Sequence, residues 1–187
     1  IQAAELSGAT VTWIDFDPES TELRPEHVAA AVTGRTKLVA LTGASNLIGT
    51  MPDIPAIADL VHGHGALLAV DGVHRTAHTV VDVAALGADF YTCSPYKFLG
   101  PHCGVLAADP TLLDTIHPDK LLPATNAVPE RFEFGTLPYE LLAGTTAAVD
   151  FLAGLDPAAA GTRRERLRTS IAAASAYEDA LRERIEA

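Results

Sequence analysis

The sequence predicts an α/β domain: a three-layer arrangement in which a mostly parallel β-sheet has helices on both faces. Two observations lead to this fold class. Short apolar segments that suit buried strands alternate with amphipathic segments that suit helices along residues 37–109. Several of the apolar segments run directly into polar residues, as strands do at the ligand-binding edge of an open α/β sheet. Helical crossovers between parallel strands are right-handed, which limits the possible topologies.

Strands and helices alternate through the first half of the chain. One helix begins at Pro25, because proline suits the first turn of a helix. In a second helix, residues 52–65, the apolar side chains recur at the spacing of one helix face. We expect strands at 10–16, 37–43 and 66–72. Trp13 and Phe16 of the first strand are expected in the core.

The alternation continues to residue 109 and then stops. A short helix at 82–87, with Asp82 as its N-cap, precedes a strand at 89–94. A tight Gly-Pro connection leads to a further strand at 104–109. Residues 111–138 are rich in proline and turn formers, so we expect an irregular segment there. The final elements are two expected helices, 139–155 and 162–187.

Composition excludes several classes of protein. The chain has 187 residues, of which 48% are hydrophobic, and this suits a globular core. Its net charge of −11 argues against nucleic acid as a partner. No apolar run reaches the roughly 20 residues that a membrane span requires. Cys93 and Cys103 lack zinc-site spacing, so we expect no metal site, and they suit a reduced, cytoplasmic protein.

Polar side chains follow three of the expected parallel strands. Such strands present their carboxyl ends at the same edge of a sheet, so these side chains are expected to lie near one another. The residues concerned are Asn46 after the strand 37–43, Asp71 and His74 after 66–72, and Ser94, Tyr96 and Lys97 after 89–94.

Asp71 and Lys97 allow two interpretations, and spacing alone favours neither. In the first, they form a buried ion pair, because a carboxylate at the end of an apolar strand needs a cation or donors. In the second, the Lys97 amine forms a Schiff base with an aldehyde cofactor, of which pyridoxal 5′-phosphate (PLP) is the common one. Asp71 would then keep the pyridine nitrogen protonated.

A series of motifs supports the second interpretation. They occur in the order SNLIGT (45–50), HGHG (62–65), VDG (70–72), DVAALGADF (82–90), SPYKFLGP (94–101) and RFEFGT (131–136). In order and spacing they resemble the class V aminotransferase family of fold-type I PLP enzymes. Within that family the sequence is most similar to cysteine desulfurases and cysteine desulfurase-like proteins.

The resemblance implies a role for each candidate residue. Lys97 would bind PLP and move protons at the substrate Cα, and Asp71 would pair with the pyridine nitrogen. His74 would lie near the ring oxygen, at a position where desulfurases usually have glutamine. Tyr96 would contact the phosphate, at a position where many desulfurases have histidine. The remaining implied contacts are Asn46 with the ring hydroxyl or substrate carboxylate, Ser94 with the phosphate, and Thr136 with the phosphate of a partner subunit's PLP in a homodimer.

The same resemblance implies that the chain is part of a longer enzyme. Residues 1–155 would belong to the PLP-binding large domain, and residues 156–187 would form a helix leading toward a C-terminal small domain that is absent. In the family, other cofactor contacts lie upstream, and the carboxylate-binding arginine and the persulfide cysteine lie downstream. Neither Cys93 nor Cys103 is expected to be the persulfide cysteine. We therefore expect this fragment alone to be inactive.

The implied function is that of a PLP-dependent enzyme acting on an amino acid, of the cysteine desulfurase-like type that cleaves a C–S bond and transfers sulfur. One alternative is a class V aminotransferase or epimerase-like enzyme. Another is an inactive, truncated fragment. A nucleotide-binding module is disfavoured, because neither G-x-G-x-x-G nor G-x-x-x-x-G-K-[ST] is present.

Overall fold

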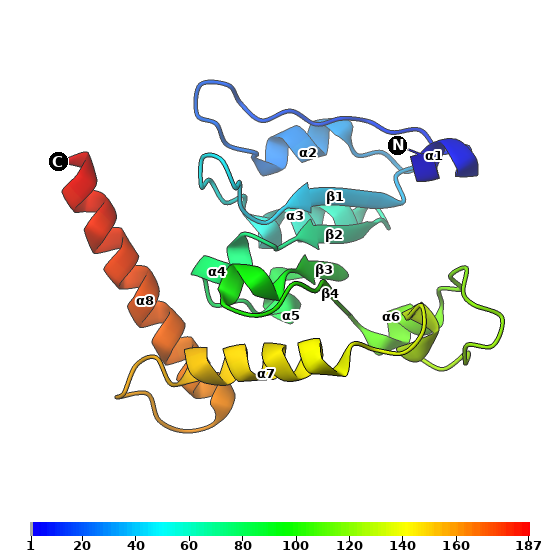
Figure 1. Ribbon diagram of the computed structural model, residues 1–187. Helices are drawn as coiled ribbons and strands as arrows, with labels where there is room; N and C mark the ends of the chain where they lie inside the picture. The colour runs from blue at the N-terminus through cyan, green and yellow to red at the C-terminus, as the bar shows by residue number, and fades with distance from the viewer. Residues whose placement is uncertain (1) are drawn as a thin grey trace.

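The computed structural model describes residues 2–187, which are organised around a four-stranded sheet (Figure 1). The strands β1 (Leu38–Thr42), β2 (Leu67–Asp71), β3 (Phe90–Cys93) and β4 (Val105–Ala108) lie side by side in this order. β1, β2 and β3 are parallel, and β4 is antiparallel to β3. The predicted α/β class and the mostly parallel sheet are confirmed.

The register of the parallel strands aligns their polar ends. Thr42 of β1 lies opposite Asp71 of β2, and Asp71 lies opposite Thr92 of β3. Residues in one row of a sheet point to the same face, so these three side chains form a row across the strand ends. The residues that precede them in each strand, such as Val70, point to the other face.

One face of the sheet is covered by helices α2 (Pro25–Ala31), α3 (Ile54–Gly63) and α5 (Val83–Leu86), and α3 and α5 lie behind the strands in Figure 1. Helix α3 contributes most to this core, because Ile54, Ile57 and Val61 are fully buried. Aspartate side chains cap the first turns of α3 and α5. Asp53 accepts a hydrogen bond from the Ala56 amide, and Asp82 accepts one from the Ala85 amide, both at 3.2 Å. From the sheet, Val39, Leu68, Val70 and Tyr91 join this core.

The opposite face of the sheet is open within residues 2–187. Leu38 at the start of β1 is 53% exposed, and Leu106 on β4 is 51% exposed. Of the predicted three-layer arrangement, the described residues therefore contain the sheet and one covering layer. The open face is the one that carries Asp71.

Two long helices form a second packed unit beside the sheet. α7 (Tyr139–Ala153) packs against α8 (Arg163–Glu186), and both were predicted within a few residues. Thr162 and Glu165 cap α8 reciprocally, as in a capping box. α8 also contacts the short helix α4 (Arg75–His78), and α7 contacts the 3₁₀ helix η1 (Pro95–Phe98). Figure 1 shows α7 passing below the sheet and α8 rising from it toward the C-terminus.

The predicted strand at 10–16 is wrong. This segment has no regular structure, and Trp13, expected in the core, is 75% exposed, with Phe16 also exposed. Strand-forming side chains stabilise a strand only when a neighbouring strand pairs with it, and none of the described strands lies beside this segment.

Four short elements were not predicted. They are α1 (Gln2–Ser7), α4, α6 (Pro110–Asp114) and the 3₁₀ helix η2 (Glu130–Phe132). Each spans one or two turns, which is too short for a hydrophobic period to be read from sequence. The rest of the segment 111–138 is irregular, as expected.

Residues 2–187 contain neither a candidate membrane-spanning helix nor a candidate metal cluster. No helix in this range is both long and apolar enough to cross a membrane. No group of three or more His, Cys, Asp or Glu side chains in the same range is arranged to hold a metal ion.

The core on α3 gives a stability prediction. Ile57 is fully buried and Ile185 is 84% exposed, so the same substitution tests burial at two sites. We expect Ile57→Ala to lower the free energy of unfolding by about 2–5 kcal/mol through lost apolar contacts and a cavity. Ile185→Ala should change it by less than about 0.5 kcal/mol. Urea denaturation measures both values, and equal values would contradict this core.

Candidate functional site

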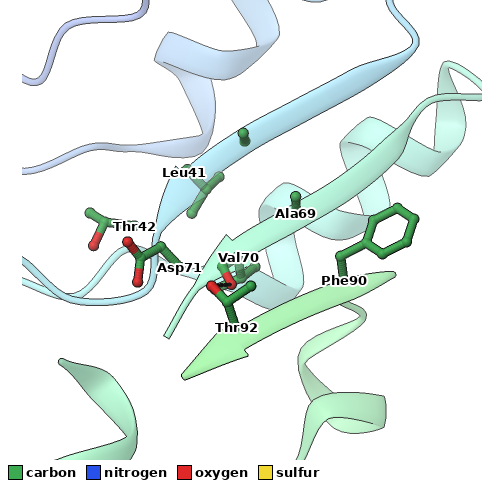
Figure 2. A pocket seen from close by; sticks show the side chains of 8 residues that line it. Leu41, Thr42, Ala69, Val70, Asp71, Phe90 and Thr92 are labelled. Carbon is green, nitrogen blue, oxygen red and sulfur yellow. Dashed lines mark hydrogen bonds between the residues drawn. The ribbon is translucent and has the colours of Figure 1, made fainter. Parts of the chain in front are cut away.

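The candidate site is centred on Asp71, the last residue of β2. Its carboxylate lies on the open face, and Oδ1 accepts a hydrogen bond from the Val73 amide at 3.0 Å. Figure 2 shows the side chains of Thr42, Asp71 and Thr92 gathered at the strand ends. They border an open hollow of about 440 Å³, whose floor includes Ala69 and Phe90. No cation within residues 2–187 pairs with this carboxylate.

Lys97 lies at the end of the neighbouring strand. It belongs to η1, in the loop that joins β3 to the antiparallel β4, where Cys93 lies opposite Val105. Its side chain is exposed, and Nζ is 5.7 Å from the centroid of the Tyr96 ring. In the described part of the chain, Lys97 and Asp71 form no ion pair. The interpretation of these two residues as a buried structural pair is therefore wrong.

Gly72 allows the turn after Asp71 to pass close to β3. A Cβ atom on Gly72 would lie 2.0 Å from Cζ of Tyr91, so only glycine fits beneath this ring. The Tyr91 hydroxyl is 2.9 Å from Thr76 Oγ1, which donates to the Gly72 carbonyl at 2.7 Å. Burial raises the pKa of Tyr91, so the phenol remains protonated. This contact ties the end of β2 to β3 and to α4.

His74 precedes α4, which packs against η1. The structure therefore brings the element that carries His74 next to the one that carries Lys97. The ring of His74 packs against that of His78, with centroids 4.8 Å apart. His74 Nδ1 is buried and has no hydrogen-bond partner among the described residues.

The other predicted site residues do not line the hollow. Asn46 is exposed in the turn after β1, and Ser94 is half-buried at the start of η1. The Tyr96 ring stacks on His102, with centroids 4.8 Å apart. Thr136 is exposed in the segment before α7. Of all the predicted residues, only Asp71 lines the hollow itself.

Arg75 was missed by the sequence analysis. Its Nη1 donates to the Gly43 carbonyl at 3.3 Å, and its Nε is buried without a partner in residues 2–187. The Gly43 amide in turn donates to the Asp71 carbonyl at 2.7 Å. Arg75 thus joins the ends of β1 and β2 from the covered side of the sheet. No motif identified this arginine, because it lies in a helix of one turn. Thr42 and Thr92 were also missed, although strand alternation with Asp71 could have indicated them.

The two cysteines have packing roles in the structure. Cys93 is half-buried on β3, and burial raises the pKa of its thiol. Cys103 Sγ lies 3.6 Å from the Thr145 hydroxyl of α7. A raised pKa reduces the thiolate fraction at neutral pH, so Cys93 is a poor nucleophile.

Comparisons with known proteins identify the family of the chain. The family model described as aminotransferase class V matches residues 1–181. A probable cysteine desulfurase of Halalkalibacterium halodurans is 34% identical over 169 residues, covering 83% of this chain and 41% of the relative. An aminotransferase-like protein of Gibberella zeae is 49% identical over 105 residues, covering 55% of this chain and 26% of the relative.

A solved structure matches the fold. The cysteine desulfurase CsdA of Escherichia coli superposes with a TM-score of 0.73 at 27% sequence identity, covering 83% of this chain and 42% of that protein. The chain spans less than half the length of the curated relatives it matches.

The close approach of Gly72 and Tyr91 gives a second prediction. Gly72→Ala should lower the free energy of unfolding by at least about 1–3 kcal/mol, because the new methyl group displaces the ring or the strand end. Gly34→Ala is the matched control, since a Cβ atom there meets no atom within 4 Å. Urea denaturation compares the two variants. A Gly72→Ala protein as stable as the control would show that Tyr91 does not close over this turn.

The raised pKa of Cys93 gives a third prediction. In a Cys103→Ser variant, we expect iodoacetamide to alkylate Cys93 more slowly in the folded chain than in urea, because the thiolate is the reactive form. The rate should increase as the pH rises toward the pKa of the thiol. Mass spectrometry over time measures the reaction. Equal rates in the folded and unfolded chains would contradict the burial of this thiol.

Proposed function

Since the chain belongs to the class V aminotransferase family, we propose that it is the PLP-binding part of a cysteine desulfurase-like enzyme. Class V aminotransferases and cysteine desulfurases are PLP-dependent. One observation supports the proposal most. The carboxylate of Asp71 and the amine of Lys97 follow adjacent strands, and neither forms an ion pair within residues 2–187.

The residues present fit PLP chemically. A carboxylate stabilises the protonated form of the pyridine nitrogen. Asp71 is available for this role, because it has no cation partner among residues 2–187. An aldehyde requires a free amine, and Lys97 has an exposed one. The buried, unpartnered Nδ1 of His74 is a further polar atom in the adjoining turn that a ligand would satisfy.

We assign the residues as follows. Lys97 would hold PLP through its side-chain amine and would move the proton at the substrate Cα. Asp71 would keep the ring nitrogen protonated, and His74 would lie near the ring oxygen. When bound, PLP supplies an electron sink for the bond cleaved at the substrate. The remaining contacts are Asn46 with the ring hydroxyl or substrate carboxylate, Ser94 and Tyr96 with the phosphate, and Thr136 with the cofactor of a partner subunit in a homodimer.

The proposed substrate is an amino acid, with cysteine first among the candidates. We infer that the sulfur-accepting cysteine lies outside these 187 residues, because the half-buried Cys93, whose thiol pKa is raised, is a poor nucleophile. A second candidate is an aminotransferase or epimerase-like reaction. The similarity to an aminotransferase-like protein and the histidine at position 74, where desulfurases usually have glutamine, favour this alternative.

Three further expectations belong to this proposal. Residues 1–155 form part of the PLP-binding large domain, and residues 156–187 lead toward a C-terminal small domain. The two free cysteines suit a cytoplasmic protein. The 187 residues alone bind PLP weakly or not at all and are inactive, because family contacts to the phosphate and the ring come from other segments.

Reduction with borohydride tests the Schiff base. The protein expressed from its full reading frame is incubated with PLP, reduced and digested. We expect a pyridoxyl group on the peptide that contains Lys97 and none on those with Lys37 or Lys120, the other two lysines of this chain. Lys120→Ala should retain the labelled peptide and Lys97→Ala should lose it. A folded protein without an adduct on Lys97 would overturn the proposal.

Product analysis of the same preparation distinguishes the reactions. Sulfide release and alanine formation from cysteine would support desulfurase activity. Amino-group transfer to a 2-oxo acid, without sulfide, would support the aminotransferase alternative. The 187-residue chain, treated in parallel, tests whether these residues bind PLP by themselves.

A further inference from the structure

A contact between α8 and α4 joins two segments that lie 100 residues apart. His78 Nδ1, at the end of α4, is 3.2 Å from Glu178 Oε2 on α8. Both side chains are partly exposed. An exposed contact between a histidine and a carboxylate contributes at most about 1 kcal/mol to stability. The contact therefore adds little to the docking of α8.

His78 touches His74. The two rings lie one helical turn apart, with centroids 4.8 Å apart and planes inclined by 53°. Because Nδ1 of His74 has no hydrogen-bond partner within residues 2–187, no bond at this atom orients the ring. The orientation of His74 is instead set by packing, and His78 provides an aromatic surface for it.

His78 is itself oriented from outside its own helix. Its own helix, α4, is only four residues long, so this helix alone gives little support to a side chain. Glu178 lies on a helix of 24 residues, whose start is fixed by the Thr162–Glu165 capping box. A residue of the long helix α8 thus orients the ring of His78 on the short helix α4.

We infer that His78, held by Glu178, is a positioning residue for His74. α8 thereby fixes the ring of a candidate cofactor contact through His78. The importance of this arrangement for catalysis rests on the proposed function, whereas the arrangement itself concerns only side chains of this chain.

Nuclear magnetic resonance of the 187-residue chain with ¹³C-labelled histidine tests the inference without cofactor. The ring signals of His74 and His78 are assigned from His74→Gln and His78→Phe variants. We expect Glu178→Gln to shift or broaden the ring signals of both His78 and His74. Glu183→Gln is the matched control, because it removes the same charge from the same helix at a side chain that makes no ion pair within residues 2–187.

A double-mutant comparison identifies the route. If His78 transmits the effect, Glu178→Gln should cause no further change at His74 in the His78→Phe background. Three outcomes would overturn the inference: an unchanged His74 signal in Glu178→Gln, an equal change in Glu183→Gln, or a change that persists in the His78→Phe background. Thermal denaturation of each variant shows that the chain remains folded.

This test is independent of PLP. If borohydride labels no lysine but the His74 signal follows Glu178, the proposed function fails and the positioning of His74 stands. If Lys97 is labelled but His74 ignores Glu178, the inference fails and the proposed function stands.

Discussion

The packing of α3 against the sheet is the interaction on which the rest of the structure depends. Ile54, Ile57 and Val61 are fully buried against the face of the sheet that carries Leu68 and Val70. Because side chains alternate along a strand, burying Val70 places Asp71 on the opposite face. A shift of one residue in register would exchange the two faces and bury the carboxylate. The hydrophobic core therefore determines where the polar end of β2 lies.

The elements predicted correctly are those whose evidence is local. A repeat of apolar residues identifies α3, and a capping aspartate identifies α5. The segment 10–16 has strand-forming residues, but no described strand pairs with it. The sequence alone does not show whether a neighbouring strand is present. α4 spans four residues, too few to show a period, although it carries or adjoins much of the candidate site.

The candidate site was only partly predictable for a similar reason. The positions of Asp71 and Lys97 after adjacent strands follow from the order of apolar segments along the chain. Whether the two side chains pair depends on the geometry of η1, and the structure keeps them apart. The need for glycine at position 72 can be predicted only when the position of the Tyr91 ring is known. The contact of His78 with Glu178 joins residues that lie 100 positions apart in the sequence. Such contacts exist only in the folded chain.

The loop that carries Lys97 has a consequence for motion. Its two ends are held together by the antiparallel pairing of Cys93 with Val105, and its first turn is a 3₁₀ helix in which the Lys97 amide donates to the Ser94 carbonyl. A loop fixed in this way restrains the backbone but leaves an exposed side chain free to rotate. Rotations of exposed side chains occur in picoseconds to nanoseconds, whereas loop rearrangements extend to microseconds. The amine of Lys97 can therefore reorient by bond rotation alone, at least about a millionfold faster than typical enzyme turnover and without a rate-limiting movement of the chain.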